Sequence, residues 1–504
     1  MTDPVPYTPS DIEGAAAEER LKRIGKIESM RSVGVDPYPV NFSRTTTCSA
    51  LHEKFDGLEP GEETTEVVSV AGRMLLFRDQ GKLVFATIRD GNGSIQLFVS
   101  KSVVGDEAFS QFCDLDLGDW VGVSGNVMKT RKGELSIKVA SAELLSKAVR
   151  PMPDKWHGLS DVDTRFRQRY VDLIANEDAR RVFEIRFGAI AAIRTYLRER
   201  NFVEVETPVL QPIAGGATAR PFLTHHNALG TEFALRIAPE LYLKRLIVGG
   251  MEKVFEIGRV FRNEGVSTRH NPEFTMFELY AAFADYNDMA ALTENIIAAA
   301  ALATVGTTQV ELDGRKINLD PPFRRATMRE LVVEHANLDL HPSQPVEELR
   351  AHCERLEIPF KNEWGSGKLL LEIYEKTTEH KIVEPTFVMD YPVEVSPFAR
   401  VHRADKDLTE RWELIINGRE LANAFSELND PIDQYQRFEN QVKMKQLGDD
   451  EAQGMDDDYV RALEYGMPPT GGVGIGIDRL VMLIAGVSSI REVILFPHLR
   501  PEAK

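Results

Sequence analysis

Five short β-type segments within about eighty residues restrict the fold of this chain more than any other feature. The segments cover residues 67–73, 83–88, 94–99, 120–127 and 134–139. Asp90-Gly91-Asn92-Gly93 joins the second segment to the third as a tight hairpin turn. Five strands in so short a stretch predict a small closed β-barrel of the oligonucleotide-binding (OB) kind at residues 66–145.

The rest of the chain has a different pattern, and we predict an α+β protein with four parts. Residues 1–65 form a helical extension, whose charged, Ala-rich first helix is broken by Val35-Asp36-Pro37-Tyr38-Pro39. Arg150-Pro151-Met152-Pro153-Asp154 marks a linker at 146–178. Residues 179–504 form a larger domain, which begins with an amphipathic helix at 178–200 and contains a helical insertion at about 287–383.

Composition excludes several classes of protein. Hydrophobic residues make up 43% of the chain, which is a globular proportion. The start of the chain lacks the features of a secretory signal, and no apolar run reaches the ~18 residues of a membrane span. We therefore expect a cytoplasmic protein with no membrane partner. Cys48, Cys113 and Cys353 lie far apart in sequence and are predicted to be free thiols.

The net charge of −18 argues against a protein that coats DNA or RNA. Residues 126–155 are a local exception, because basic residues there outnumber the acidic Glu134, Glu143 and Asp154. The basic residues of this stretch are Lys129, Arg131, Lys132, Lys138, Lys147, Arg150 and Lys155. Two interpretations stay open: a solvated surface, or a track that contacts nucleic-acid phosphates.

Two glycine-rich stretches do not match the familiar nucleotide-binding motifs. Gly365-Ser366-Gly367-Lys368-Leu369 lacks the first glycine and the final Ser or Thr of a P-loop. Residues 471–479 do not fit the G-x-G-x-x-G pattern in any register. A nucleotide site, if present, must be built from other residues.

Residues 255–280 predict an antiparallel hairpin with a long polar loop at 263–272. In the second strand, the period of two places Phe274, Met276, Glu278 and Tyr280 on one face. An aromatic ring, a carboxylate and a phenol on one face indicate a binding surface. The alternative is an edge strand with a solvated Glu278.

Asn417-Gly418 predicts a second tight hairpin, in which Ile415 lies opposite Glu420. Glu413 is then a diagonal neighbour of Glu420, so the two carboxylates could share a cation or could simply be solvated. Strict alternation puts Asn423, Phe425 and Glu427 on the opposite face of this hairpin. If all five residues serve one pocket, the register must shift, and we predict a β-bulge near residues 421–422.

Three stretches carry a resemblance to the class II aminoacyl-tRNA synthetases, and they occur in the order of that family. Phe202-Val203-Glu204-Val205-Glu206-Thr207-Pro208-Val209-Leu210 resembles motif 1. Arg262-Asn263-Glu264 with His270-Asn271-Pro272-Glu273-Phe274 resembles motif 2. Gly474-Ile475-Gly476-Ile477-Asp478-Arg479-Leu480 resembles motif 3, with Asp478 where Glu is usual. Together with the barrel, the likeness is closest to the bacterial-type lysyl-tRNA synthetases.

This resemblance implies an ATP-dependent, AMP-forming ligase of protein biosynthesis. It implies that L-lysine and ATP give lysyl-adenylate and pyrophosphate, and that lysine then passes to the 3′-terminal ribose of tRNA(Lys). It also implies Mg²⁺, with up to three ions accompanying ATP, and a homodimer formed through the motif 1 region. The lysine carboxylate is already ionised, so the reaction needs cations that position two anions rather than a general base.

The resemblance also assigns roles to residues, with Arg262 and Arg479 as the catalytic pair. Arg262 would bridge the lysine carboxylate and the α-phosphate, and Arg479 would flank adenine opposite Phe274. The ATP-binding residues are Arg262, Glu264, His270, Asn271, Phe274, Glu413 and Arg479. The lysine-binding residues are Gly216, Glu240, Arg262, Glu278, Tyr280, Asn423, Phe425 and Glu427, and the metal ligands are Glu413 and Glu420.

Alternatives to these roles remain for two residues. Pro239-Glu240 also reads as a helix start, where a glutamate is favoured without any ligand. Arg479 could be a cation at a helix start.

The barrel is expected to bind the anticodon. The positions that match the family there are Arg78, Phe85, Gln96 and Glu134. Phe85 would stack on a base while the polar groups bond base edges. Phe85 could instead belong to the barrel core.

Three other functions stay open from sequence. A paralogue that lysylates a protein would resemble only the catalytic part, and the barrel argues against it. A catalytically dead, RNA-binding relative is disfavoured by the intact Arg262, Glu413, Glu420 and Arg479. A plain nucleic-acid-binding module would not need the roughly 350 residues that follow the barrel.

Overall fold

The computed structural model describes residues 13–91, 93–152, 161–446 and 454–500. The chain divides into two compact units, residues 1–158 and 159–504. Asn92 of the predicted turn and Asp154 and Lys155 of the basic stretch lie outside the described residues, as does the start of the predicted first helix.

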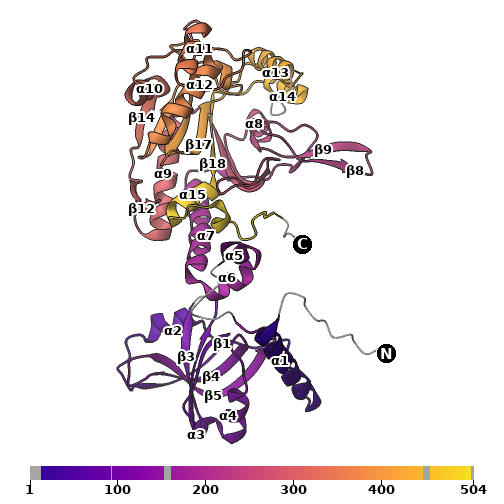
Figure 1. Ribbon diagram of the computed structural model, residues 1–504, viewed down its shortest axis with the longest axis vertical. Helices are drawn as coiled ribbons and strands as arrows, with labels where there is room; N and C mark the ends of the chain where they lie inside the picture. The colour runs from indigo at the N-terminus through magenta and orange to yellow at the C-terminus, as the bar shows by residue number, and fades with distance from the viewer. Residues whose placement is uncertain (1–12, 92, 153–160, 447–453, 501–504) are drawn as a thin grey trace. The chain divides into compact units, whose positions relative to one another are not determined.

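The first unit contains the predicted barrel (Figure 1). Its strands close in the order β1-β2-β3-β5-β4, and β3 and β5 are the parallel pair. The strands are β1 (Glu63–Asp79), β2 (Leu83–Arg89), β3 (Ser94–Ser100), β4 (Trp120–Lys129) and β5 (Leu135–Ser146). Side chains such as Val70, Val84 and Leu97 are fully buried inside it. The helices of this unit are α1 (Gly14–Ser32), α2 (Cys48–Phe55), α3 (Lys101–Val104) and α4 (Asp106–Cys113).

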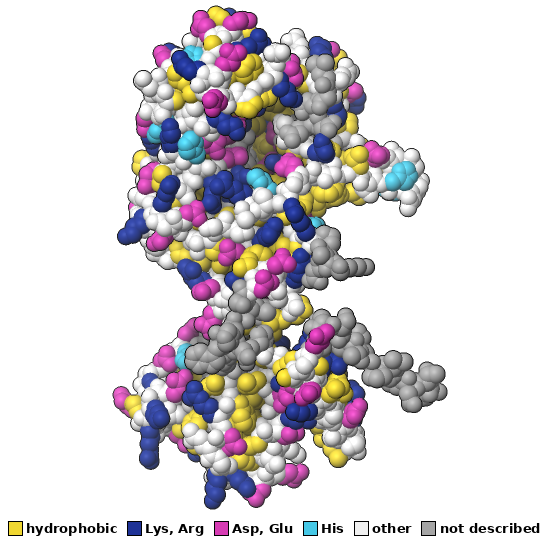
Figure 2. Space-filling view, in the orientation of Figure 1, with side chains coloured by type: hydrophobic (Ala, Val, Ile, Leu, Met, Phe, Trp, Pro, Cys, Tyr) yellow, Lys and Arg dark blue, Asp and Glu magenta, His cyan; other side chains and the backbone are white. Residues whose placement is uncertain are grey.

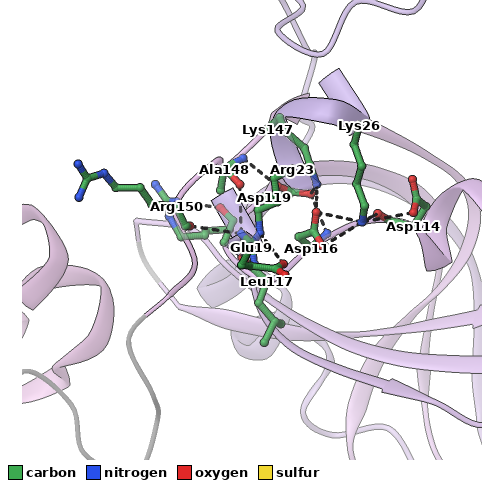
Figure 3. Close-up of polar contacts among 12 residues, drawn as sticks. Glu19, Arg23, Lys26, Asp114, Asp116, Leu117, Asp119, Lys147, Ala148 and Arg150 are labelled. Carbon is green, nitrogen blue, oxygen red and sulfur yellow. Dashed lines mark hydrogen bonds and ion pairs between the residues drawn. The ribbon is translucent and has the colours of Figure 1, made fainter. Parts of the chain in front are cut away.

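Partly buried ion pairs attach α1 to the barrel (Figure 3). Lys26 Nζ lies 3.0 Å from Asp116 Oδ1 and donates to the Asp114 carbonyl at 2.7 Å. Lys147, just after β5, pairs with the same Asp116 and with Asp119 at 2.7 Å, and its side chain is fully buried. The first unit therefore orders its N-terminal helix through charges that neutralise one another.

This network corrects one part of the basic stretch. Both interpretations of this stretch place Lys147 at the surface, but its ammonium is enclosed by two aspartates and cannot reach a phosphate. Exposed basic residues of the stretch include Arg131 and Lys132. Lys138 is already paired with Glu63 at 2.8 Å.

The second unit is built on an eight-stranded sheet in the order β14-β15-β16-β17-β18-β11-β10-β6. The six central strands are antiparallel, and the pairs β14–β15 and β10–β6 at the two edges are parallel. The strands are β6 (Val203–Glu204), β10 (Lys253–Phe261), β11 (Glu273–Ala282), β14 (Arg324–Thr327), β15 (Thr386–Met389), β16 (Arg411–Ile416), β17 (Arg419–Ser426) and β18 (Thr470–Gly476).

Helices α7 (Glu177–Arg198), α9 (Tyr286–Val305) and α15 (Ile477–Ala485) share one hydrophobic core with this sheet. The apolar stripe predicted for α7 enters that core through Val182, Ile185, Ala189, Ile193 and Leu197. Phe277 and Leu279 of β11 point into the same core. Their neighbours Phe274, Met276, Glu278 and Tyr280 therefore face the other side of the sheet, as the period of two requires.

The other side of the sheet carries a separate cluster around α8 (Glu240–Val248). Leu241, Leu243 and Ile247 of α8 pack there with Tyr280 of β11. Helices α13 (Pro431–Gln446) and α14 (Asp457–Glu464) add Phe438 and Tyr459 to the cluster. This cluster fixes α8 beside the strand that carries Glu278 and Tyr280.

The predicted helical insertion at 287–383 is only partly correct. α9 packs in the main core, and β14 is an edge strand of the main sheet. A small sheet of β12 (Gln309–Leu312) and β13 (Arg315–Asn318) also belongs to this region. Only α10 (Met328–Ala336), α11 (Val346–Arg355) and α12 (Ser366–Thr377) form a helical cluster with its own core.

Helix α9 has the length and apolar composition of a membrane span, and half of its most apolar window is buried inside the unit. That burial is what a helix of a protein core shows, since it packs against the sheet and α7. The three cysteines are free thiols, as expected.

The predicted linker at 146–178 is also structured in part. It contains α5 (Val162–Arg167) and α6 (Arg169–Ala175), which belong to the second unit. Arg169 is 1% exposed and pairs with Asp172 at 2.6 Å. β7 (Leu210–Gln211), β8 (Leu223–His226) and β9 (Thr231–Leu235) form a small sheet, from which β8 and β9 project (Figure 1). The remaining elements of this unit are the short helix α16 (Ile490–Val493) and the 3-10 helices η1 (Glu379–Lys381) and η2 (Val393–Val395).

Candidate active site

A cleft of about 360 Å³ opens on the face of the sheet opposite the main core. Figure 2 shows the second unit hollowed, with acidic and basic side chains together in the walls. The cleft is lined by all residues that the sequence predicts for ATP, lysine and metal: Gly216, Glu240, Arg262, Glu264, His270, Asn271, Phe274, Glu278, Tyr280, Glu413, Glu420, Asn423, Phe425, Glu427 and Arg479. Segments far apart in sequence thus meet at one site.

β11 is a central strand rather than an edge strand. It pairs with β10 on one side and β18 on the other. Glu278 and Tyr280 are only 5% and 3% exposed. The alternative of a solvated Glu278 on an edge strand is therefore wrong.

The predicted β-bulge is confirmed in the β16–β17 hairpin. Leu414 pairs with Ala422 and Ile415 pairs with Glu420, so Leu421 is the extra residue. Asn417 and Gly418 both have positive φ, 51° and 64°, as a two-residue turn of this kind requires. The shifted register lets the residues on both sides of Leu421 line one cleft.

The glycine-rich strand β18 forms the floor of the cleft. Gly472 pairs with Tyr280 and Phe425, and Gly474 pairs with Glu278 and Asn423. A Cβ atom on Gly472 would lie 2.0 Å from Glu427 Oε1 and 2.5 Å from the Tyr280 ring. The glycines rejected as a nucleotide motif thus keep the space between the acidic side chains open.

One end of the cleft is acidic and closed. Tyr280 Oη donates to Glu278 Oε2 at 3.0 Å. Burial raises the pKa of Glu278 to about 8, and the negative charge of Glu240 adds to the shift. Burial also raises the pKa of Glu427 well above its usual range. These carboxylates are costly to keep ionised without a cation, and this end is therefore suited to a cationic group.

The opposite end is basic and contains aromatic groups. The Arg262 guanidinium lies 5.2 Å from the Phe274 ring centroid, and its Nε is buried with no hydrogen-bond partner among the described residues. Arg479 Nη1 donates to the Glu420 carbonyl at 2.6 Å and lies 3.3 Å from its carboxylate. Desolvation lowers the pKa of His270, and the charge of Arg479 lowers it further. Such a set of donors can bind a phosphate.

Glu413 and Glu420 lie beside this basic end. Glu413 accepts hydrogen bonds from Arg411 at 2.5 Å and from Tyr391 Oη at 2.9 Å. Burial raises the pKa of Glu413 to about 7, against the opposing charge of Arg411, and Glu420 raises it further. Within the described residues, no cluster of three or more His, Cys, Asp or Glu could hold a metal. A divalent ion here would need oxygen ligands from a bound molecule as well.

Two predicted residues have protein partners that the motifs did not indicate. The side-chain amide of Asn271 donates to the Glu273 carbonyl at 2.5 Å and accepts from His498 N at 3.1 Å. Asp478, where motif 3 departs from the usual glutamate, pairs with Arg186 at 2.6 Å and accepts from Thr275 N at 2.7 Å. The shorter carboxylate thus joins α15 to α7 and β11.

The four barrel residues predicted for the anticodon are not in the barrel core. Val84 and Ala86 are fully buried, so Phe85 between them points outward, where it is half-buried. Its ring packs edge-on against Phe98 at 5.6 Å. Arg78 pairs with Phe85 across β1 and β2, and Gln96 accepts a bond from Ser136 at 2.9 Å. Arg78 and Glu134 are exposed.

Comparison with known proteins agrees with this geometry. The family described as tRNA synthetases class II (D, K and N) matches residues 161–500, and the OB-fold nucleic acid binding domain matches residues 68–145. The chain belongs to the class II tRNA synthetases. The resemblance drawn from the three motifs is confirmed, and so is the α+β fold with an N-terminal OB barrel.

Relatives of this synthetase align over nearly their whole length. The lysine–tRNA ligase of Xanthomonas oryzae pv. oryzae is 53% identical over 510 residues, 99% of each chain. That of Nostoc sp. is 52% identical over 492 residues, covering 96% of this chain and 88% of its own. That of Carboxydothermus hydrogenoformans is 49% identical over 479 residues, 95% and 97% of the two chains.

Two residues at the synthetase cleft were missed from sequence: Lys244, which lies behind its wall, and Arg411, which lines it. Lys244 is buried beside Glu240 and Glu427, and its position four residues after Glu240 on a helix could have indicated the contact. Arg411 bonds both Glu413 and Asn423. The period of two along β16 places Arg411 on the face of Glu413, so this contact was also predictable.

Proposed function

We propose that this synthetase is a lysine–tRNA ligase. It joins L-lysine to the α-phosphate of ATP with release of pyrophosphate, and then transfers lysine to the 3′-terminal ribose of tRNA(Lys). The observation that carries the proposal is the closed acidic end of the cleft, where Glu278 and Glu427 are buried, set against Arg262 at the basic end. The relatives named lysine–tRNA ligase support it.

The acidic end binds the lysine side chain. Glu278 and Glu427 pair with the ε-ammonium, and Tyr280 supports Glu278 through its hydroxyl. Glu240, Asn423 and Gly216 hold the α-amino and carboxylate end. A neutral side chain would leave buried carboxylates without a cation, at a cost of about 3–5 kcal/mol. Selection therefore rests on charge rather than on size alone.

The basic end binds ATP and promotes attack by the lysine carboxylate. Arg262 holds the carboxylate and the α-phosphate together, and its unpartnered Nε leaves a donor free for an anion. Phe274 and Arg479 enclose the adenine, with Glu264 and Asn271 near it, while His270 contacts a terminal phosphate. Because the nucleophile is already ionised, positioning and charge neutralisation lower the barrier without a general base.

Glu413 and Glu420 fit a magnesium site that ATP completes. Their carboxylates repel each other, and burial together with the charge of Glu420 raises the pKa of Glu413. Mg²⁺ favours a few carboxylates plus phosphate oxygens over an all-protein cage. The metal would supply positive charge against the phosphates, and up to three ions are expected with ATP.

The first unit binds the tRNA. Phe85 stacks on an anticodon base, and Arg78, Gln96 and Glu134 bond base edges. This role is supported by half-buried and exposed aromatic and polar groups on β1, β2 and β3 and just before β5. Arg131 and Lys132 remain available for phosphates.

The synthetase acts as a homodimer in the cytoplasm. The motif 1 stretch and the helix α7 before it expose apolar side chains that a monomer would keep in water, among them Phe187 (56%), Val203 (50%) and Leu210 (48%). They lie on α7, β6 and β7, the segments expected at the interface. A second copy would cover them.

Pyrophosphate exchange into ATP tests the activity. Lysine should support the exchange, while aspartate and asparagine, the other amino acids of this family group, should not. Exchange that depends on aspartate instead of lysine would overturn the proposed specificity.

A further inference from the structure

Lys244 places an ammonium group directly behind the acidic end of the cleft, in contact with two of the glutamates that line it. Its side chain is 0% exposed, and its Nζ lies 2.5 Å from Glu240 Oε1 and in ion-pair contact with Glu427 Oε2. The Phe398 and Phe425 rings surround the ammonium at 5.0 and 5.2 Å. Lys244 is therefore bound by two carboxylates and enclosed by aromatic groups.

We infer that Lys244 is an internal counter-ion that keeps Glu240 and Glu427 ionised and fixed, and thereby matches the pocket to a substrate with two ammonium groups. It is a positioning and specificity-determining residue. The inference rests on the proposed activation of lysine and names a further residue of that site.

The acidic end of the cleft has a formal charge that a bound lysine can balance. Glu240, Glu278 and Glu427 are all buried at this end. Three carboxylates and the Lys244 ammonium leave a formal charge of −2. Lysine brings one α-ammonium and one ε-ammonium to this end, while its carboxylate faces Arg262. The bound state is then neutral in a region of low dielectric, where unbalanced charge is expensive.

The carboxylate oxygens of Glu240 and Glu427 are divided between Lys244 and the open cleft. Lys244 contacts Oε2 of Glu427, whereas Oε1 is the atom nearest the open floor at Gly472. Glu240 likewise contacts Lys244 through Oε1 alone. Each carboxylate thus gives one oxygen to the internal lysine and keeps the other for the substrate. Without Lys244, the two carboxylates would repel each other and one would take up a proton.

Among the described residues, the other groups around Glu240 and Glu427 offer no replacement for this cation. Glu278, Tyr280 and Tyr459 face the same compartment and are neutral or negative. The positive charge of Arg411 opposes the rise in the pKa of Glu240. The Arg411 guanidinium is, however, already hydrogen-bonded to Glu413 and Asn423.

Calorimetric titration of the full-length protein with L-lysine tests the inference. Each titration is run at pH 7 in two buffers of different ionisation enthalpy, which counts the protons released per lysine bound. The variants are K244M, K244R and, as a matched control on the surface, K253M. The wild type must bind lysine for the proposed function to hold. If the wild type shows no binding heat with lysine, the proposed function itself is wrong, and not only the role of Lys244.

K244M should bind lysine about 30-fold more weakly or worse, as for a buried charge pair that loses one partner. It should also release about one proton more per lysine, because the carboxyl group that protonates in its absence must ionise again on binding. K244R should return toward the wild-type proton count, and K253M should equal the wild type. An unchanged proton count in K244M, with or without weaker binding, would overturn the inference.

A double variant covers the case in which K244M does not fold. K244M/E240Q removes one charge of each sign and so keeps the formal pocket charge of −2. It should fold and unfold thermally near the wild-type temperature even where K244M precipitates. If K244M/E240Q also fails to fold, Lys244 is needed for packing rather than for charge, and the inference is wrong.

Discussion

The hydroxyl of Tyr280 donates a hydrogen bond to Glu278 at 3.0 Å, and the strand register places Gly472 opposite Tyr280 and Gly474 opposite Glu278. Glu278 and Tyr280 are only 5% and 3% exposed, yet both side chains line the open cleft above the glycines. A buried carboxylate that faces a cavity is costly to ionise until a cation binds beside it.

Glu278→Gln should reduce kcat/KM for lysine by about 100-fold or more, because the variant loses a charge-assisted bond in a dry site. Pyrophosphate exchange measures this effect. Tyr280→Phe, which keeps Glu278 but removes its donor, should cost only about 10-fold. Wild-type kinetics in Glu278→Gln would remove this residue from the site.

The affinity for lysine should rise with pH between about 6.5 and 8. Burial raises the pKa of Glu278 to about 8, so the free pocket is largely protonated at the acidic end of that range. The ammonium of lysine must displace this proton, and binding therefore strengthens as pH rises through the pKa. KM for lysine at several pH values tests the slope, which Glu278→Gln should flatten. A KM that increases over this range would contradict the assignment.

Gly472→Ala should block the lysine pocket while the sheet stays folded. Its Cβ would lie 2.0 Å from Glu427 Oε1, which the side chain cannot tolerate without moving. We expect KM for lysine to rise by about 100-fold, with a smaller effect on KM for ATP. Gly474→Ala on the same strand is the matched control, since its Cβ meets the flexible end of Met276 at 3.2 Å. Equal effects of the two substitutions on KM for lysine would contradict the specific role of Gly472 in keeping the lysine pocket open.

Glu413→Gln and Glu420→Gln should raise the Mg²⁺ concentration needed for half-maximal exchange by about 10-fold each. Titration of Mg²⁺ at fixed ATP measures the requirement. Glu384→Gln, at an exposed position, serves as the control. An unaltered Mg²⁺ requirement in both variants would exclude this pair as the metal site.

Phe85→Ala should separate tRNA recognition from activation. Loss of one stacking ring should lower charging of tRNA by about 10-fold, in line with the stacking energy of one base. Lysine-dependent pyrophosphate exchange should not change, because Phe85 lies in the barrel unit and does not line the cleft. A matching loss in both assays would show that Phe85 supports the fold instead.

Local periodicity predicted the parts of the site that lie within single hairpins. The face shared by Glu278 and Tyr280 follows from alternation along β11. The need for a bulge at Leu421 followed from requiring Glu413 and Glu427 to serve one pocket. Both arguments use only residues close in sequence, for which backbone geometry leaves few choices.

Contacts between segments that are distant in sequence could not be predicted from local periodicity. Lys147 reads as a surface cation until the loop before β4 places Asp116 and Asp119 around it. Lys244 reads as the polar side of a short helix until Glu427 arrives from the end of β17. β14 joins the main sheet because β15, some sixty residues later, lies beside it. Burial of a charge depends on partners that sequence spacing does not bring together.

A crystal structure of the full chain with bound lysine tests the central claim most directly. We predict the ε-ammonium between Glu278 and Glu427, within hydrogen-bond distance of both, and the carboxylate against Arg262. Lysine bound elsewhere, with these two glutamates facing bulk water, would contradict the account.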